Sequence, residues 1–289
     1  MKIINFGSLN IDHVYQVSHF VTPGETIAAK EYNKNPGGKG MNQSIALARA
    51  GATVYHAGKI GNDGLFLKEM LEDNGVNTSC LRIGDVPTGH AMIQVDPSGQ
   101  NCILIFSGAN GAVSEEEIRA VFSQFEAGTY VLLQNEIVGI ATLITAAKDA
   151  GLKVILNPSP INEELLSAPL DRVDYFIFNE IEGAALTGKT DFLEILDAMR
   201  EMYPNSEVVL TMGSKGAMFD NDDLRVYVPA QKAKAVDTTA AGDTFTGYFF
   251  ASYLAGEDPQ KALELAAKAA AITVSRHGAA ASIPSMKEI

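Results

Sequence analysis

Tryptophan and cysteine are the residues that this sequence uses least. It has no Trp and two cysteines, Cys80 and Cys102, and neither cysteine lies in a C-x-x-C motif or a His-rich segment. We therefore expect two free thiols rather than a disulfide framework or a cysteine metal site. Basic residues are also scarce, with 22 Lys and Arg against 35 Asp and Glu, and the formal net charge is −13. This balance argues against a nucleic-acid or anionic-membrane partner, because both require a basic face.

Long hydrophobic runs are lacking as well. The apolar stretches are too short for a transmembrane helix, and the N-terminal segment MKIINFGSLN reaches polar residues too early for a secretory signal. We therefore expect a cytoplasmic protein. Hydrophobic residues still make up 46% of the 289 positions, which is enough to bury a sizeable core.

From about residue 114 onward, apolar strands and helices alternate. Buried strands are predicted near residues 130–133, 153–156, 175–178 and 207–211, with helices near 114–125, 140–150 and 192–202 between them. Two Ala-rich helices are predicted near 242–254 and 259–276. This order predicts an α/β fold whose mostly parallel sheet is covered on both faces. Ligands of such sheets bind beyond the carboxyl ends of the strands, where Asn157, Asn179 and Thr211 fall.

The first hundred residues depart from this rhythm. A strand at 2–7 and a helix at 40–50 are predicted, together with strand-like segments at 13–18, 26–33 and, more weakly, 79–106. We interpret these extra strands as a small sheet that covers part of the molecule.

Two common nucleotide-binding loops are absent. Residues 36–41 (PGGKGM) look like a P-loop, but Asn33 stands where that loop requires glycine, and Gly40 where it requires Ser or Thr. The Rossmann motif G-x-G-x-x-G does not follow the first strand either. Any phosphate must therefore be held by a different device.

The best candidate is the segment 236–245 (VDTTAAGDTF), in which small residues lead directly into an apolar helix. The backbone N–H groups of Ala240, Ala241, Gly242 and Asp243 would be unpaired there and would form an anion hole. Asp243, in the first turn, could accept a hydroxyl proton beside that hole. The plain alternative is that Asp243 only caps the helix.

A second candidate is the glycine-rich segment 37–42 (GGKGMN). Its glycines permit close backbone approach to a ligand, and Asn42 would face the same way from the first turn of the next helix. An ordinary glycine-rich turn is the alternative.

Taken together, these motifs resemble the ribokinase branch of the ribokinase/phosphofructokinase-B carbohydrate kinases over essentially the whole chain. Residues 7–12 (GSLNID) match the family's sugar-binding turn, 37–40 with Asn42 its first signature, 179–182 (NEIE) its magnesium and phosphate motif, and 237–243 its second signature. The resemblance implies one kinase domain over residues 1–289. Its fold would be a ribokinase-like three-layer sandwich with a small β lid contributed by about 12–35 and 86–107.

The same resemblance implies the reaction and the roles of the site residues. The γ-phosphate of Mg·ATP would pass to the 5-hydroxyl of D-ribose, with Asp243 as the base. The sugar would be bound by Asn10, Asp12, Gly38, Lys39, Asn42, Glu136 and Asp243. The nucleotide would be bound by Asn179, Thr211, Gly213, Ser214, Lys215, Gly216 and Gly242.

Metal sites and a partner are also implied. Asn179 and Glu182 would position Mg²⁺ through water, although Asn179 could also cap the following helix. An activating K⁺ would lie beside the anion hole, at positions Asp237, Thr239, Thr273, Arg276, Gly278 and Ser282. Lids of this family often pair between subunits, so a homodimer is expected.

Three alternatives stay open at this stage. The acceptor could be a nucleoside, or another sugar or sugar phosphate, since nucleoside kinases on this fold use the same signatures. A non-catalytic sugar-binding regulator would be free to lose Asp243, Gly242 or Glu182, and all three are present. His90 stands in the predicted lid where an apolar residue was expected and could alter specificity.

Overall fold

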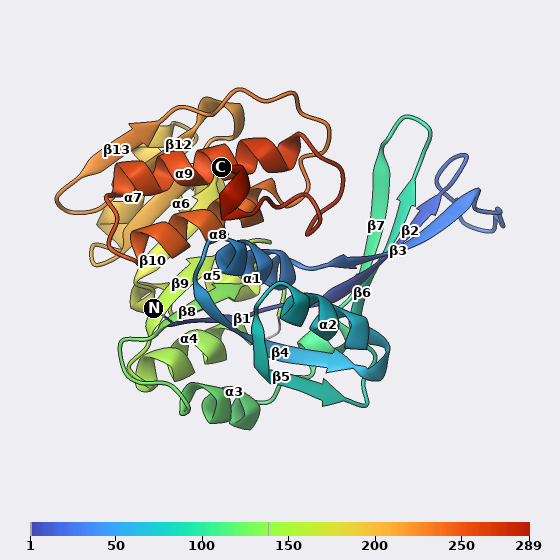
Figure 1. The fold of residues 1–289 in the computed structure, drawn as a ribbon, viewed down its shortest axis with the longest axis horizontal. Coiled ribbons are helices and arrows are strands. Elements are labelled where there is room, and N and C mark those ends of the chain that lie inside the picture. The colour runs from blue at the N-terminus through green and yellow to red at the C-terminus, as the bar shows by residue number, and fades with distance from the viewer. Residues whose placement is uncertain (1, 138) are drawn as a thin grey trace.

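A nine-stranded sheet forms the centre of the molecule in the computed structural model, which describes residues 2–137 and 139–289 (Figure 1). The strand order is β13-β12-β11-β10-β9-β8-β1-β4-β5, and the pairs from β11 to β5 are parallel, whereas β12 and β13 are antiparallel additions. The strands are β1 (Lys2–Phe6), β4 (Thr53–Gly61), β5 (Asn77–Gly84), β8 (Tyr130–Gln134), β9 (Lys153–Asn157), β10 (Tyr175–Asn179), β11 (Glu207–Thr211), β12 (Ala217–Asp220) and β13 (Arg225–Val228).

Helices cover both faces of this sheet. The α-helices are α1 (Lys39–Arg49), α2 (Leu65–Asp73), α3 (Glu115–Phe122), α4 (Ile140–Asp149), α5 (Glu163–Leu166), α6 (Glu180–Thr187), α7 (Phe192–Met202), α8 (Ala241–Tyr253) and α9 (Pro259–Val274). Successive strand residues face opposite sides, so Ile3 packs in one core with α1, α2, α8 and α9, while Ile4 packs in the other with α3 to α7. Two hydrophobic cores on either side of one sheet make the three-layer sandwich that the sequence predicts.

Four further strands form a second sheet, which we call the small sheet. It has the order β3-β2-β6-β7 and consists of β2 (Asn10–Gln16), β3 (Glu31–Gly37), β6 (Gly89–Val95) and β7 (Asn101–Phe106). These strands project away from the three layers, at the right of Figure 1. All of them lie within or close to the two segments expected to form the lid.

Several local expectations are corrected by the structure. The weakly alternating region 79–106 does not belong to one sheet, because β5 joins the edge of the central sheet beside β4. Residues 26–30 are not in a strand, since β3 begins at Glu31. Strand β4 and helix α2 were not predicted. Helix α2 mixes buried and exposed residues, and His56, Gly58 and Lys59 interrupt the apolar pattern of β4, so that both periodicities are weak. Helix α6 is the helix that Asn179 was considered to cap.

Within the described ranges, no helix combines the length and the hydropathy that crossing a bilayer requires. Both cysteines are free, as expected. The interpretation of residues 1–289 as one kinase domain stays a prediction, and its members Met1 and Val138 lie outside the described residues.

Candidate active site

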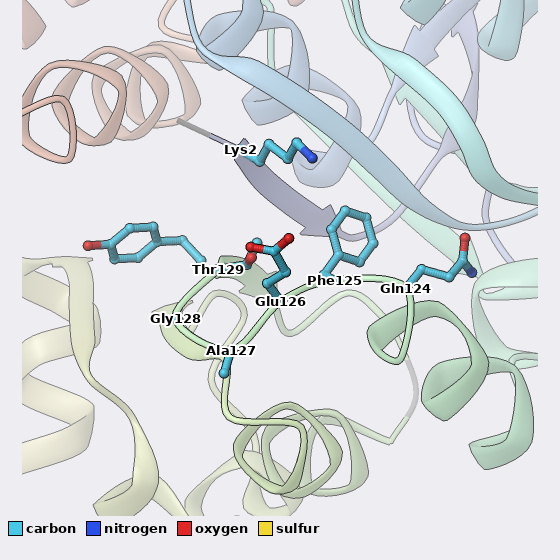
Figure 2. Close-up of a pocket in the computed structure, with 8 residues that line it drawn as sticks. Lys2, Gln124, Phe125, Glu126, Ala127, Gly128 and Thr129 are labelled. Atoms are coloured by element: carbon cyan, nitrogen blue, oxygen red, sulfur yellow. The ribbon is translucent and has the colours of Figure 1, made fainter.

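A cavity of about 240 Å³ lies at the carboxyl ends of β9, β10 and β11. It is lined by Lys39, Asn157, Ser159, Ile177, Phe178, Asn179, Glu182, Thr211, Thr238, Ala240, Ala241, Gly242, Asp243 and Thr246. A larger cavity of about 310 Å³ lies at the opposite edge, where Lys2 and Tyr130 begin β1 and β8, and Figure 2 shows Lys2 facing the turn 124–129 there. That cavity contains none of the predicted site residues, so the smaller one is the candidate active site.

The amino terminus of α8 opens into this cavity. Its N-cap, Ala240, has φ 60°, and no other described non-glycine residue has a positive φ. Such backbone strain is concentrated at functional sites, where the surrounding structure holds it in place. No described residue accepts a hydrogen bond from the N–H of Gly242 or Asp243. The N–H of Ala241, which was also expected to be unpaired, instead donates to Thr238 O over 3.3 Å, because the chain turns tightly before the helix. The free N–H groups and the helix dipole can attract an anion.

The carboxylate of Asp243 is held beside this hole by two amides of helix α1. Asn42 Nδ2 donates to Oδ2 over 3.0 Å, and Gln43 Nε2 donates to Oδ1 over 2.9 Å. Asp243 is only 8% exposed. It does not cap the helix with its side chain, because no hydrogen bond joins it to a backbone N–H of the described residues. The buried Asn42 Oδ1 has no partner among the described residues, so a donor group of a ligand could satisfy it.

Lys39 lines the cavity and lies near the carboxylates of Asp243, Glu136 and Glu182. Burial lowers the pKa of its ammonium, but Asp243, Glu136 and Glu182 outweigh this effect and hold the pKa above its ordinary value. Lys39 is therefore cationic at pH 7, at the edge of the cavity where a phosphate would be bound.

The residues predicted to bind the sugar meet around the glycine-rich turn. Glu136 Oε2 accepts hydrogen bonds from Lys39 N at 2.8 Å and from Ser8 Oγ at 2.6 Å. Gly38 precedes α1 with φ 98°, a conformation that favours glycine. A side chain at the neighbouring Gly37 would displace the Asp12 carboxylate, because a Cβ there would lie 2.2 Å from Asp12 Oδ2.

Asp12 and Asn10 complete this group from strand β2. Burial, together with the nearby negative charge of Glu136, raises the pKa of Asp12 to about 6. Asn10 Oδ1 accepts a hydrogen bond from Asn110 Nδ2 over 2.8 Å.

Asn179 and Glu182 both line the cavity and form a capping box on α6. Asn179 Oδ1 accepts from the N–H of Ile181 and of Glu182, each over 2.9 Å, and Glu182 Oε2 accepts from Asn179 N over 2.9 Å. The capping function considered for Asn179 is thus confirmed. Glu182 Oε1 takes part in no hydrogen bond with a described residue, so it remains available to a ligand.

The positions assigned to a monovalent cation are brought together only in part. Asp237 Oδ1 accepts from Thr239 N over 2.9 Å, and its Oδ2 accepts from Gly278 N over 3.0 Å. The side chains of the other three positions point elsewhere: Thr273 Oγ1 lies 3.0 Å from Thr244 Oγ1, Ser282 Oγ donates to Ala279 O over 2.7 Å, and Arg276 pairs with Glu288 over 2.8 Å.

The predicted nucleotide loop is a hairpin turn between the antiparallel strands β11 and β12. Thr211 lines the cavity, and Gly213, Ser214 and Lys215 follow it in a 3₁₀ turn. The ammonium of Lys215 lies 4.7 Å from the centre of the Phe192 ring. A side chain at Gly216 would be excluded, because its Cβ would lie 2.1 Å from Val228 O.

Comparison with known proteins identifies the family. The profile of the pfkB family carbohydrate kinases matches residues 1–286. The chain belongs to the pfkB family of carbohydrate kinases. Ribokinase of Haemophilus influenzae is 36% identical over 98% of this chain and 95% of its own length. Deoxyribokinase of Salmonella typhi is 33% identical over 100% and 97%. The structure of Arabidopsis thaliana ribokinase complexed with ribose and ATP covers 99% of this chain and 96% of its own, with 33% identity and a TM-score of 0.84.

The pfkB family assignment confirms the resemblance seen in the motifs and identifies the protein as a phosphotransferase with a hydroxyl group as acceptor. Two polar residues connected to Asp243 were not predicted: Gln43, which donates to its carboxylate, and Gln134, which donates to Gln43. The segment 108–110, whose Asn110 contacts Asn10, had been considered as a sign of a free ribose acceptor. Gln134 ends the apolar strand YVLLQ, and a polar residue at a fully buried strand position was the signal that could have indicated it.

Proposed function

We propose that this pfkB-family kinase transfers the γ-phosphate of ATP to the 5-hydroxyl of D-ribose, giving ribose 5-phosphate. The observation that carries the proposal is the Asp243 carboxylate, held by two amides beside an open helix N-terminus. A base and an anion hole side by side are what in-line phosphoryl transfer to an alcohol requires. The similarity to ribokinases, one of them solved with ribose and ATP, supports this acceptor and this donor.

The proposed reaction is a single displacement without a phosphoenzyme. The sugar oxygen forms a bond to the γ-phosphorus while the bond from that phosphorus to the bridging oxygen of ADP breaks. Asp243 accepts the proton of the attacking hydroxyl. The backbone N–H groups of Ala240, Gly242 and Asp243 bind the charge that spreads over the transferred phosphoryl group, and Lys39 adds a positive charge on the same side.

Hydroxyl recognition is assigned to the polar groups around the glycine-rich turn. Carboxylates and amides provide directional acceptors and donors for a neutral polyol. The free acceptor Asn42 Oδ1 suits a sugar hydroxyl that donates toward it. We assign the same task to Asn10, Asp12, Gly38, Lys39 and Glu136. The nucleotide is assigned to Asn179, Thr211, Gly213, Ser214, Lys215, Gly216 and Gly242.

The residues at the cavity fit a magnesium ion that retains most of its water. Asn179 and one oxygen of Glu182 are occupied by the helix cap, so a direct cage of several carboxylates is excluded at this position. Glu182 Oε1 could hold a metal-bound water, which agrees with the preference of Mg²⁺ for few protein ligands. The ion would neutralise charge on the β- and γ-phosphates.

A potassium ion is also part of the proposal. Asp237 ties the loop before α8 to the Gly278 turn, and both the N–H of Val236 and that of Asp237 donate to Val274 O. Backbone carbonyls of two such adjoining segments are suitable ligands for a large monovalent cation. Within the described residues, no group of three or more His, Cys, Asp or Glu could hold a metal, so carbonyl oxygens would have to supply most of the site.

The small sheet is proposed as a lid that closes over the sugar and pairs with a second copy. Its edge strand β7 is exposed along its whole length, with Leu104 68% and Ile105 67% accessible. A long apolar edge strand is a site for association unless a partner covers it. We therefore propose a homodimer through the small sheets. The cytoplasmic location stays a prediction.

ADP release tests the proposed function. The rate is measured with Mg·ATP and K⁺ across ribose, deoxyribose, fructose, fructose 6-phosphate, adenosine, inosine and cytidine. The highest kcat/KM is expected for ribose. A preference for deoxyribose, the substrate class named for the Salmonella relative, or for a nucleoside would overturn the acceptor and leave the phosphotransfer mechanism intact. Sugar binding without turnover on any acceptor would instead favour a non-catalytic regulator.

A further inference from the structure

A buried chain of hydrogen bonds leads from the Asp243 carboxylate through the centre of the protein. Gln43 of α1 donates from Nε2 to Asp243 and accepts at Oε1 from Gln134 Nε2 over 2.6 Å. Gln134 Nε2 also donates to Asn5 Oδ1 over 2.9 Å. A second arm continues from Asn5 Nδ2 to Ser44 Oγ at 2.8 Å, and Ser44 Oγ lies 2.8 Å from His56 Nδ1.

The three adjacent strands β8, β1 and β4 supply the members of this chain that do not belong to α1. Asn5 is in register with His56 of β4 and with Leu132 of β8, two residues before Gln134. All three polar side chains therefore lie on the sheet face that α1 covers. Gln43 is 1% exposed, and Asn5, His56 and Gln134 are 0% exposed. Buried amides are stable when their polar atoms find hydrogen-bond partners, and in this chain of hydrogen bonds only Gln134 Oε1 and His56 Nε2 have none among the described residues.

The Asp243 carboxylate, which ends this series of hydrogen bonds, sets the donor and the acceptor of each bond in it. An ionised carboxylate only accepts, so the amide N–H₂ of Gln43 must face Asp243, and its carbonyl must face Gln134. Gln134 then donates along both arms. On the second arm Ser44 accepts from Asn5 and donates to His56. Burial lowers the pKa of His56 to about 4, against the opposing effect of the Gly7 backbone, which favours a protonated ring, so the imidazole is neutral and can accept at Nδ1.

One arm thus ends on the proposed base and the other ends in the core. The Nε2 atom of Gln43 also lies 3.3 Å from Asn157 Oδ1, and Asn157 donates to Ile177 O over 2.8 Å. The Gln43 amide is consequently held from three sides, by Asp243, Gln134 and Asn157. If its contact were lost, Asn42 would be the one side chain among the described residues still donating to the carboxylate, and rotation of the carboxylate about its χ2 bond would be less restricted.

We propose that Gln43, held by Gln134, is a positioning residue that fixes the orientation of the Asp243 carboxylate for proton transfer. The inference rests on the proposed role of Asp243 as base. Because Gln43 is buried, does not line the cavity and acts through Asp243, its loss should lower kcat and leave the KM of sugar and of ATP nearly unchanged. A purely structural role would lower stability without this separation.

The test compares Gln43→Met with Ser44→Ala in the full-length protein. Both changes remove a buried hydrogen-bonding group of helix α1 from the same chain, but Ser44 belongs to the arm that does not reach Asp243. A hydrogen bond to a charged group is worth roughly a ten- to hundredfold effect on the equilibrium it controls. We expect Gln43→Met to lower kcat by about that factor, with the sugar KM within about threefold of wild type. Ser44→Ala should retain kcat, while melting temperature falls in both variants.

Three results would overturn the inference: an unchanged kcat in Gln43→Met, an equal loss of kcat in Ser44→Ala, or a loss confined to the sugar KM. If Gln43→Met does not fold, Gln134→Met removes the support of Gln43 one bond further away. It should then lower kcat by a few-fold, and a wild-type kcat there would be equally decisive.

Asp243→Asn, measured alongside, separates this inference from the proposed function. Near-normal turnover in Asp243→Asn would refute the base itself. An inactive Asp243→Asn with a fully active Gln43→Met would refute only the positioning role. In the double variant, Gln43→Met should add no further loss to that of Asp243→Asn, because the residue through which it acts is already disabled.

Discussion

Gly242 offers a substitution whose effects on stability and on catalysis should have opposite signs. It lies in the first turn of α8 at the cavity, its φ is not positive, and a Cβ built on it has no heavy atom within 4 Å. Gly242→Ala should therefore fold without strain. Replacing glycine where the backbone is compatible stabilises a protein by about 0.4–1 kcal/mol, since it reduces the entropy of the unfolded chain.

In the proposed mechanism, the same methyl group would stand where the phosphoryl group approaches the N–H groups of the helix. Loss of one donor from such a hole typically lowers kcat by about 10²–10³, equivalent to about 2.7–4 kcal/mol. We expect kcat/KM for ATP to fall by this order while the melting temperature is unchanged or slightly higher. ADP release and thermal unfolding are measured on the same preparation.

Gly247→Ala is the matched control in the same helix. Its Cβ would lie 2.4 Å from Ala46 Cβ and 2.7 Å from Leu47 N, where α8 packs closely against α1. Overpacking of this kind costs about 1–3 kcal/mol. Gly247→Ala should thus lower the melting temperature. Full activity in Gly242→Ala would refute the anion hole. A marked loss of stability in this variant would refute the prediction that a methyl group at position 242 meets no neighbouring atom.

Four further predictions follow from the site and the small sheet. Asp243→Asn should lower kcat by about 10²–10⁴ and leave the melting temperature close to wild type, and near-normal turnover would exclude Asp243 as the base. The raised pKa of Asp12, about 6 against 3.8, means that its contribution to stability is present below pH 4 and is lost as the pH rises through 6. The free energy of unfolding is measured with denaturant at pH 4 and at pH 7 for wild type and Asp12→Asn. Between these two pH values wild type should lose on the order of 1 kcal/mol more than the variant, allowing for the partial exposure of Asp12. An equal change in both proteins would contradict this prediction. Replacing K⁺ by Na⁺ or by a bulky organic cation should reduce kcat, and an unchanged rate would remove the proposed cation site. Leu104→Asp should convert the proposed dimer to a monomer in sedimentation experiments, whereas a wild-type particle already monomeric would refute the dimer.

The predictions from the sequence were most accurate for the strands that are buried on both faces. The apolar runs at 130–133, 153–156, 175–178 and 207–211 match β8, β9, β10 and β11 within a residue, because strands buried on both faces are almost continuously hydrophobic. They were least accurate where polar residues or glycine interrupt the apolar pattern. Helix α2 carries Lys and Glu among its apolar residues and strand β4 carries His, Gly and Lys, so that their periodicity is weak.

The candidate site shows the same division. The anion hole and Asp243 were indicated by the run of small residues before α8 and by the glycine-rich turn before α1. Both signals lie within short segments, because a helix start and a close backbone approach depend on the residues at that position. The contact of Asp243 with Gln43, 200 positions away, has no local signal. Neither do the partners of Gln134, which depend on the register of three strands.

The amino-acid sequence by itself therefore determined the α/β class, the family and the candidate residues for phosphoryl transfer. These properties depend on hydrophobic periodicity and on residue chemistry, which are encoded within short segments. The tertiary structure alone decided that β5 joins the central sheet and that Lys39 lies among three carboxylates. It alone decided, too, that a buried amide chain ends on Asp243. These are contacts between distant segments, and they exist only because the sheet and helix α1 place their side chains within hydrogen-bonding distance of one another.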